Sequence, residues 1–273
     1  MAIQGEPGSF SHEAASNLFP QATILPCSLS ADVFCALSSG EVDSAVIPIE
    51  NSLAGSVVEH YDLLLSHDVA IESETLLRIR HNLIAIPGTS LEQIERIHSH
   101  PVALAQCRRF FLEHPRAEAV PFYDTAGSVK HIMELAKPAY AAIASARAAA
   151  YYRGEILAAG IEDNPENYTR FFHIRRRRDV SVNPEADKVS LAFTVENRPG
   201  TLVAALEVFA GQGTNLTKIE SRPVQGQPWQ YVFYADYQLA PQTRADVPLE
   251  LLRRHCSMVK ELGRYRAAQR PTP

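Results

Sequence analysis

Short apolar runs alternate with helix-like segments along the first 180 residues, and this alternation constrains the fold most. Strand-like runs stand at 45–49, 83–86, 97–101, 119–123 and 171–174. Helix-like stretches stand at 10–18, 28–37, 53–67, 91–96, 102–114 and 124–135. Such alternation indicates an α/β layer fold. We expect the strand at 171–174 to return to the first of these units, so that two lobes form with a cleft between them.

The pattern changes after residue 180. Residues 179–185 have the composition of a linker, and beyond them Val189, Leu191 and Phe193 alternate with smaller or polar side chains, as in a half-buried strand. Helix-like segments follow at 202–209 and 249–259, and strand-like segments at 216–222, 229–237 and 262–267. The resulting order, βαββαβ, is typical of a ferredoxin-like layer of helices on one face of a sheet.

We therefore predict two domains. The first spans 1–180, with one lobe at about 1–76 and 160–180 and the other at about 77–159. The second domain spans 187–268. A length of 273 residues agrees with two domains on a prior of about 150 residues each.

The overall charge argues against two classes of partner. The formal net charge is −5, so bulk electrostatics favour neither nucleic acid nor an anionic membrane. No apolar run approaches the ~20 residues needed to cross a bilayer, and no secretory leader opens the chain. The cysteines form no CxxC pair, so we expect reduced thiols and a cytoplasmic location. His98, His100 and Cys107 have no matching further ligands, so no metal is expected.

The run 167–171 contains the side chains best suited to chemistry. Asn167, Thr169 and Arg170 follow a turn and precede the apolar Phe171. An amide, a hydroxyl and a guanidinium can hold and protonate a small oxygen-rich anion, and the planar guanidinium suits a carboxylate. The alternative is an ordinary strand start with a surface arginine.

A second polar cluster, Glu50, Asn51 and Ser52, ends the apolar run at 45–49. Ligands of α/β proteins bind at such strand ends, but Asn51 or Ser52 could equally cap a following helix. Because both clusters emerge from buried strands, we predict one pocket assembled from distant parts of the chain.

Two further segments carry the same ambiguity. Gly5–Ser9 lies between a strand and a helix, where backbone amides could bind an anion, although a plain turn is the favoured interpretation. Asp124 and Thr125 could contribute to the pocket or cap the helix that follows them.

At these residues the chain resembles the prephenate dehydratase family over nearly its whole length. The family's elements occur in order: 5–9, 48–52 with 55–56, 99–101 with 106–107, 124–126 and 167–171. The segment 216–223 resembles the signature of the family's ACT regulatory domain. The resemblance implies a two-lobed, periplasmic-binding-protein-like catalytic domain followed by a ferredoxin-like ACT domain.

The resemblance also implies a lyase of phenylalanine biosynthesis. Prephenate would lose carbon dioxide and water to give phenylpyruvate, with no metal or organic cofactor. The hydroxyl of Thr169 would assist departure of the ring hydroxyl, and Arg170 would pair with a carboxylate or, if it points away, brace its loop. Glu50 is a further candidate acid. The substrate-binding residues implied are Gly8, Ser9, Asn51, Ser52, Thr125, Asn167 and Phe171.

For the ACT region, the resemblance implies feedback by phenylalanine at an interface between chains, hence a homodimer or homotetramer. The effector-binding residues implied are Asn197, Pro199, Gly200, Thr201, Leu202, Glu220, Ser221 and Arg222. Thr201 stands where many relatives carry alanine, and Glu220 with Arg222 could instead form a purely structural pair. We expect a monofunctional enzyme without a fused chorismate mutase domain. An arogenate dehydratase and a non-catalytic amino-acid sensor remain as alternatives.

Overall fold

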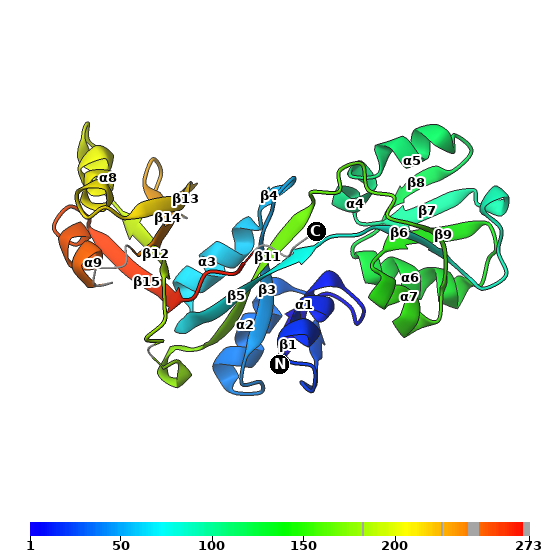
Figure 1. Cartoon of the computed structure of the whole chain (residues 1–273), viewed down its shortest axis with the longest axis horizontal. Coiled ribbons are helices and arrows are strands. Elements are labelled where there is room, and N and C mark those ends of the chain that lie inside the picture. The colour runs from blue at the N-terminus through cyan, green and yellow to red at the C-terminus, as the bar shows by residue number, and fades with distance from the viewer. Residues whose placement is uncertain (182, 225, 240–245, 270–273) are drawn as a thin grey trace. The chain divides into compact units, whose positions relative to one another are not determined.

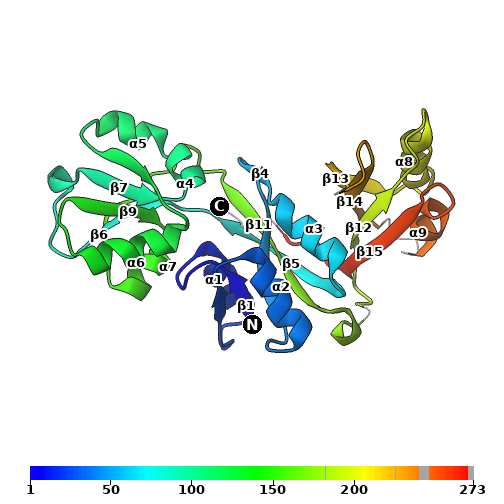
Figure 2. The same cartoon turned by 180° about the vertical axis from the view of Figure 1, so that it is seen from behind.

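The computed structural model describes residues 1–181, 183–224, 226–239 and 246–269 (Figures 1 and 2). Within them the chain divides into two compact units, one formed by residues 1–60 and 75–171 and the other by 61–74 and 172–269. Helices and strands occur throughout both, so the predicted α/β class is confirmed. None of the described helices has the length and apolar character needed to span a membrane.

The first unit contains a sheet built from both ends of the predicted catalytic region. Its strand order is β2 (Leu25–Cys27), β1 (Ala2–Gln4), β3 (Ala45–Asn51) and the first residues of β11 (Tyr168–Arg176), whose residues from 172 on belong to the other unit. Strand β1 pairs in parallel with β2 and β3. Helices α1 (Phe10–Leu18) and α2 (Ser30–Ser39) connect the early strands. The return of the late strand, expected from sequence, brings Phe171 into one core with Ile3 and Val46.

The expected helix at 53–67 is shorter than predicted. Residues 55–56 form β4 (Gly55–Ser56), which pairs antiparallel with the end of β3, and α3 (Val58–Ser66) starts only afterwards. Residue 55 has a φ of +85°, which glycine adopts without strain, so the chain can turn there before the helix. The polar cluster at 50–52 is therefore followed by a hairpin.

A second sheet in the first unit has the strand order β10 (Glu155–Ala159), β6 (Asn82–Ala85), β9 (Tyr140–Ala144), β7 (Arg96–Ser99) and β8 (Glu118–Pro121). The pair α4 (Pro101–Ala105) and α5 (Arg108–Glu113) covers one face, and the pair α6 (Thr125–Leu135) and α7 (Ala146–Tyr152) covers the other (Figure 1). Between β6 and β7 the chain forms one 3-10 turn (Leu91–Gln93).

The single helix expected at 102–114 is wrong. Asp163 accepts hydrogen bonds of 2.9 Å from the backbone amides of both Arg108 and Arg109, and so caps a new helix at that point. Gln106 ends α4, and Cys107 is fully buried between the two helices. A capping partner 55 residues away cannot be read from local periodicity.

The second unit contains β12 (Lys188–Thr194), α8 (Thr201–Gly211), β13 (Asn215–Pro223), β14 (Tyr231–Gln238), α9 (Asp246–Leu252) and β15 (Met258–Tyr265). The four strands pair antiparallel in the order β13-β14-β12-β15, as a βαββαβ ferredoxin-like unit requires. Val189, Leu191 and Phe193 point to the helices and form the core with Phe209. The predicted helix at 249–259 ends at residue 252, because β15 begins at Met258.

The same unit includes the end of α3 and the start of β5 (Val69–Arg78), a strand that the sequence did not predict. Ile71 pairs in parallel with Gly263 of β15. The domain limits 1–180 and 187–268 therefore stay predictions, since the compact unit also takes in 61–74 and 172–181. Val182 of the predicted linker, and residues 225 and 240–245 of the predicted second domain, lie outside the described residues.

Candidate active site

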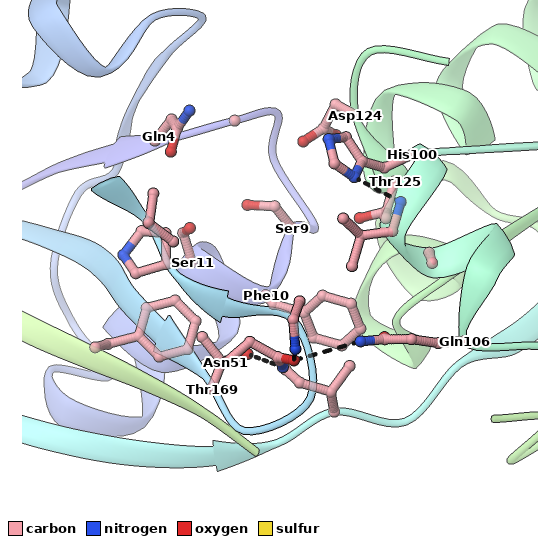
Figure 3. A pocket seen from close by; sticks show the side chains of 18 of the residues that line it. Gln4, Ser9, Phe10, Ser11, Asn51, His100, Gln106, Asp124, Thr125 and Thr169 are labelled. Atoms are coloured by element: carbon pink, nitrogen blue, oxygen red, sulfur yellow. Dashed lines mark hydrogen bonds between the residues drawn. The ribbon is translucent and has the colours of Figure 1, made fainter. Parts of the chain in front are cut away.

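A cavity of about 390 Å³ lies within the first unit, a size typical of small-molecule sites (Figure 3). It is lined by the ends of β1 and β3, the starts of α1, α4 and α6, and the first residues of β11. Figure 3 shows Asn51, Thr169 and Gln106 joined along one side of the cavity. His100, Asp124 and Thr125 lie along another side.

The early and late polar clusters meet at this cavity. Asn51 and Thr169 both line it, and Asn51 Nδ2 donates a hydrogen bond of 3.0 Å to Thr169 Oγ1. The same nitrogen lies 2.7 Å from Asn167 Oδ1, and Asn167 is fully buried beneath the wall. Among the other residues implied for the substrate, Ser9, Thr125 and Phe171 also line the cavity. The convergence of two distant segments was thus anticipated from sequence.

Asn51 also shapes the turn that follows β3. Its Oδ1 accepts hydrogen bonds from the backbone amides of Leu53 (3.0 Å) and Ala54 (2.8 Å). The alternative function proposed for this cluster, a helix cap, is replaced by an Asx-type turn, because α3 starts only at Val58. The oxygen of the Asn51 carboxamide therefore stabilises the turn, and its nitrogen donates to Thr169 at the cavity wall.

Ser52 holds the late loop and does not line the cavity. Its hydroxyl donates to Glu166 O (3.1 Å) and accepts from the amide of Tyr168 (2.9 Å). Its own amide donates to Tyr168 O (2.8 Å). Ser52 thus fixes the loop that carries Thr169, which is a supporting position and not the direct contact that the resemblance implied.

The structure does not bring Arg170 and Glu50 to the cavity. Side chains alternate along a strand, so Thr169 and Phe171 face the cavity while Arg170 points to the other side of β11. Arg170 is 8% exposed, and its Nη1 lies 3.7 Å from Glu50 Oε2. These two residues form an ion pair behind the wall, which corresponds to the bracing alternative for the arginine.

The glycine-containing turn at 5–9 packs tightly, but its amides are occupied. Gly8 has a φ of +89°, and a β-carbon there would lie 2.8 Å from Ala148 Cα, so glycine is required. Its amide donates to His12 Nδ1 (2.9 Å), and the amide of Ser9 donates to Glu6 O (3.1 Å). The anion cradle implied for these amides is therefore not free in this structure. The hydroxyl oxygen of Ser9 lines the cavity and caps α1 through the amide of His12.

The charged groups around the cavity are acidic. Glu6 and Asp124 line it, and no lysine or arginine is among the described residues that do. Burial raises the pKa of Asp124, helped by the nearby Glu6, although amides at the start of α6 oppose the shift. Burial lowers the pKa of His100, which Asp124 partly offsets. The Asp124 carboxylate caps α6 by accepting from the amide of Gly127, so the N-terminus of α1, capped by the neutral Ser9, is the helix end that brings positive potential to the cavity.

Sequence reasoning gave no role to Gln106 and His81, which also line the cavity. Gln106 Nε2 donates to Asn51 Oδ1 (3.3 Å), and Gln106 Oε1 accepts from Asn167 Nδ2 (2.9 Å). His81 Nε2 lies 2.9 Å from the same Gln106 oxygen. Gln106 stands within a motif that carried the resemblance, so the signal was present, whereas His81 has no local pattern that marks it.

No group of three or more histidine, cysteine, aspartate or glutamate residues in the described part of the chain is arranged to hold a metal ion. The polar side chains of the cavity are amides, hydroxyls, imidazoles and two carboxylates. Such a set can orient a small polar molecule and donate hydrogen bonds to a leaving oxygen.

The segments implied for the effector lie in the second unit. Gly200, with a φ of +86°, precedes α8, and Thr201 Oγ1 is turned back onto its own loop, 2.6 Å from Glu196 O. Arg222 Nη2 lies 3.2 Å from Asp62 Oδ2, and Glu220 pairs with Lys218 at 3.2 Å. The structure thus gives Glu220 and Arg222 ionic partners other than each other.

Comparisons with known proteins agree with these motifs. The family model "Prephenate dehydratase" matches residues 1–179. Arogenate dehydratase 2 of Petunia hybrida is 38% identical over 281 residues, covering 97% of this chain and 71% of that protein. Arogenate dehydratase/prephenate dehydratase 2 of Arabidopsis thaliana, a chloroplastic protein, is 38% identical over 276 residues, covering 97% and 72%.

Solved structures resemble the whole chain. A prephenate dehydratase from Arthrobacter aurescens, in complex with L-Phe, has a TM-score of 0.88 and 34% identity, covering 98% of this chain and 90% of that one. GqqA, described as a novel type of quorum-quenching acylase, has a TM-score of 0.89 and 35% identity, covering 97% of both chains.

Proposed function

The chain belongs to the prephenate dehydratase family of lyases, and we propose that it converts prephenate to phenylpyruvate, carbon dioxide and water. The observation that carries the proposal is the hydrogen bond from Asn51 Nδ2 to Thr169 Oγ1 at the cavity wall. It leaves the hydroxyl proton of Thr169 for an acceptor inside the cavity.

The proposed reaction needs one departing hydroxyl to be stabilised. The bond between the ring and its carboxylate breaks, and the electron pair enters the ring. The bond to the ring hydroxyl breaks at the opposite carbon, carbon dioxide is released, and the leaving hydroxide takes a proton from solvent to become water. Thr169 donates a hydrogen bond to that oxygen, and such positioned donors contribute about 10²–10⁴-fold. Formation of the aromatic ring makes the overall reaction energetically favourable.

The two carboxylates of prephenate would be held mainly by a helix end and neutral donors. The N-terminus of α1 opens on the cavity, and Ser9 and Thr125 supply hydroxyls there. Gln4 and Ser11 are further neutral groups in the lining. The role first given to Arg170, pairing with a substrate carboxylate, passes to these groups.

The amino analogue, arogenate, is a second candidate substrate. Relatives carry arogenate dehydratase in their names, and two carboxylates, Glu6 and Asp124, line a cavity whose described lining holds no lysine or arginine. An ammonium group would be attracted to these carboxylates, whereas the keto group of prephenate would not. On this basis Glu6→Gln should lower kcat/KM for arogenate more than for prephenate.

The direct test is turnover of each substrate by the purified chain. Appearance of phenylpyruvate from prephenate, or of phenylalanine from arogenate, supports dehydratase activity, and the two values of kcat/KM decide between the substrates. Binding of either compound without any product would instead favour the non-catalytic sensor.

Regulation by phenylalanine belongs to the same proposal. The supporting observations are the ferredoxin-like unit at 188–265 and the relative solved with L-Phe. The proposed site comprises Asn197, Pro199, Gly200, Thr201, Leu202, Glu220, Ser221 and Arg222, completed by a second chain in a homodimer or homotetramer. Calorimetric titration with phenylalanine tests binding, and sedimentation with and without phenylalanine tests the assembly.

A further inference from the structure

We propose that Asn51, Asn167 and Gln106 form a hydrogen-bonded ring with a fixed direction, and that Gln106 and His81 are positioning residues which make Thr169 a donor toward the substrate. The inference rests on the proposed function, because it assigns a purpose to the Thr169 hydroxyl.

The ring consists of three side-chain amides, each donating to the next. Asn51 Nδ2 donates to Asn167 Oδ1 (2.7 Å), and Asn167 Nδ2 donates to Gln106 Oε1 (2.9 Å). Gln106 Nε2 closes the ring on Asn51 Oδ1 (3.3 Å). Residues from β3, the end of α4 and the loop before β11 therefore share one closed network.

A ring of three amides could in principle run in either direction, since each amide can exchange its oxygen and nitrogen by a flip. Backbone donors favour one of the two directions. The amides of Leu53 and Ala54 donate to Asn51 Oδ1, and a flipped Asn51 would turn its NH₂ group against both. Gln106 Nε2 is a third donor to the same oxygen, so it helps the turn to hold Asn51 in this orientation, and Asn167 follows.

His81 secures the direction from the far side of Gln106. Burial lowers the pKa of His81, so its ring is neutral near pH 7 and carries one proton. With the proton on Nε2, the ring donates to Gln106 Oε1 (2.9 Å). Nδ1 is buried with no hydrogen-bond partner among the described residues, so a proton there would be a buried donor without an acceptor. The Nε2–H form avoids this buried donor and directs the proton of the ring to Gln106 Oε1.

The direction decides what Thr169 can do. In the observed direction, Asn51 Nδ2 donates to Thr169 Oγ1 (3.0 Å) and uses a lone pair of the hydroxyl. In the reversed direction an amide oxygen would face the hydroxyl and accept its proton, and Thr169 could no longer donate to a leaving oxygen. Gln106 and His81 therefore affect the reaction by holding the ring in the direction that leaves Thr169 free to donate to the substrate.

The first test is Gln106→Glu, which keeps the shape of the side chain. An ionised carboxylate still accepts from His81 and Asn167 but cannot donate to Asn51 Oδ1, so the ring opens. We expect kcat to fall by about 10²-fold at pH 8 with little change in KM, as for a small misplacement of a catalytic group. The ratio of variant to wild-type kcat should rise as the pH falls, because a protonated carboxyl can donate again.

Gln4→Glu is the matched control, since it adds the same carboxyl to another lining glutamine outside the ring. Gln4 is among the groups proposed to hold the substrate, so we expect its new carboxylate to repel the substrate and raise KM, unlike the loss of kcat expected for Gln106→Glu. Wild-type kcat in Gln106→Glu across the pH range would overturn the proposal.

The second test needs no turnover. Nitrogen-15 NMR of histidine-labelled wild-type protein distinguishes the two imidazole tautomers, and His81→Asn assigns the signal by its disappearance. We expect the Nε2–H tautomer for His81. A Nδ1–H tautomer would contradict the fixed direction even if the enzyme is active. If instead the wild-type protein turns over neither substrate, the proposed function fails, while the tautomer still reports on the ring.

Discussion

Asn51 Nδ2 lies 3.0 Å from Thr169 Oγ1, although 118 residues separate the two in the chain. Their strands, β3 and β11, are neighbours in one sheet, so the contact is built into the fold of the first unit. It joins the two polar clusters that stand out in the sequence, and it orients the hydroxyl on which the proposed chemistry depends.

Removing the Thr169 hydroxyl should abolish most turnover. Thr169→Val keeps the branched shape, and we expect kcat to fall about 10²–10⁴-fold. Thr169→Ser keeps the hydroxyl and should retain most activity. Stability should change by only about 1 kcal/mol, because Asn51 Nδ2 keeps Asn167 Oδ1 and Tyr168 O as acceptors. Steady-state kinetics and urea unfolding check both points, and wild-type turnover in the valine variant would refute the role of Thr169.

Phenylalanine should bind more tightly when Asp62, the ion-pair partner of Arg222, is neutralised. Asp62 accepts from Tyr234 Oη (3.4 Å) and pairs with Arg222, so it competes with an effector carboxylate for the guanidinium. Asp62→Asn should tighten phenylalanine binding by up to about 5-fold, since a partly exposed ion pair is worth up to about 1 kcal/mol. Calorimetry measures the change, with the exposed Asp68→Asn as control. An unchanged affinity would mean that Arg222 takes no part in the site.

The buried ion pair between Lys188 and Glu74 should make the second unit sensitive to single substitutions. Lys188 Nζ lies 3.0 and 3.1 Å from the two carboxylate oxygens, and both side chains are at most 10% exposed. Lys188→Met should cost about 3–5 kcal/mol, because it removes the ammonium group that neutralises a buried carboxylate. Adding Glu74→Leu should restore much of that loss. Urea unfolding checks this, and Arg266→Met, in an exposed pair, should cost less than about 1 kcal/mol.

His98 should make the first unit less stable in acid. The residue is 7% exposed, and neither ring nitrogen has a hydrogen-bond partner among the described residues. Burial, followed by the charges of His131 and Arg96, lowers its pKa. The unfolded chain then binds a proton near pH 6.5 that the folded chain resists, so stability is lost as the pH falls below about 6.5. His98→Phe should remove the contribution of His98 to this loss and make the curve shallower between pH 7 and 5.

Thermal unfolding across this pH range measures the effect. His114→Phe is the control, because His114 Nδ1 is already bonded to Phe110 O at 2.9 Å. An equal flattening in both variants would show that another group causes the acid sensitivity.

Local patterns predicted most elements of the fold. Helix α1 was expected at its observed limits, and the βαββαβ order of the second unit was read from alternation and turns. The misses arose where a distant partner intervenes. Asp163 caps α5 and so separates it from α4. The unpredicted β5 lies between β15 and β11 in the sheet, and its Ile71 pairs with Gly263, almost 200 residues later in the chain.

The sequence by itself determined the layer class, the order of elements and the two polar clusters that meet at the cavity, because periodicity and polar side chains at strand ends are local properties. Only the tertiary structure decided which members of those clusters face the cavity. In the tertiary structure Arg170 points away from the cavity and pairs with Glu50, and the amides of Gly8 and Ser9 already have hydrogen-bond acceptors. Gln106 contacts Asn51, and His81 contacts Gln106. Those outcomes depend on strand register and on hydrogen-bond partners far apart in the chain, which no local window contains.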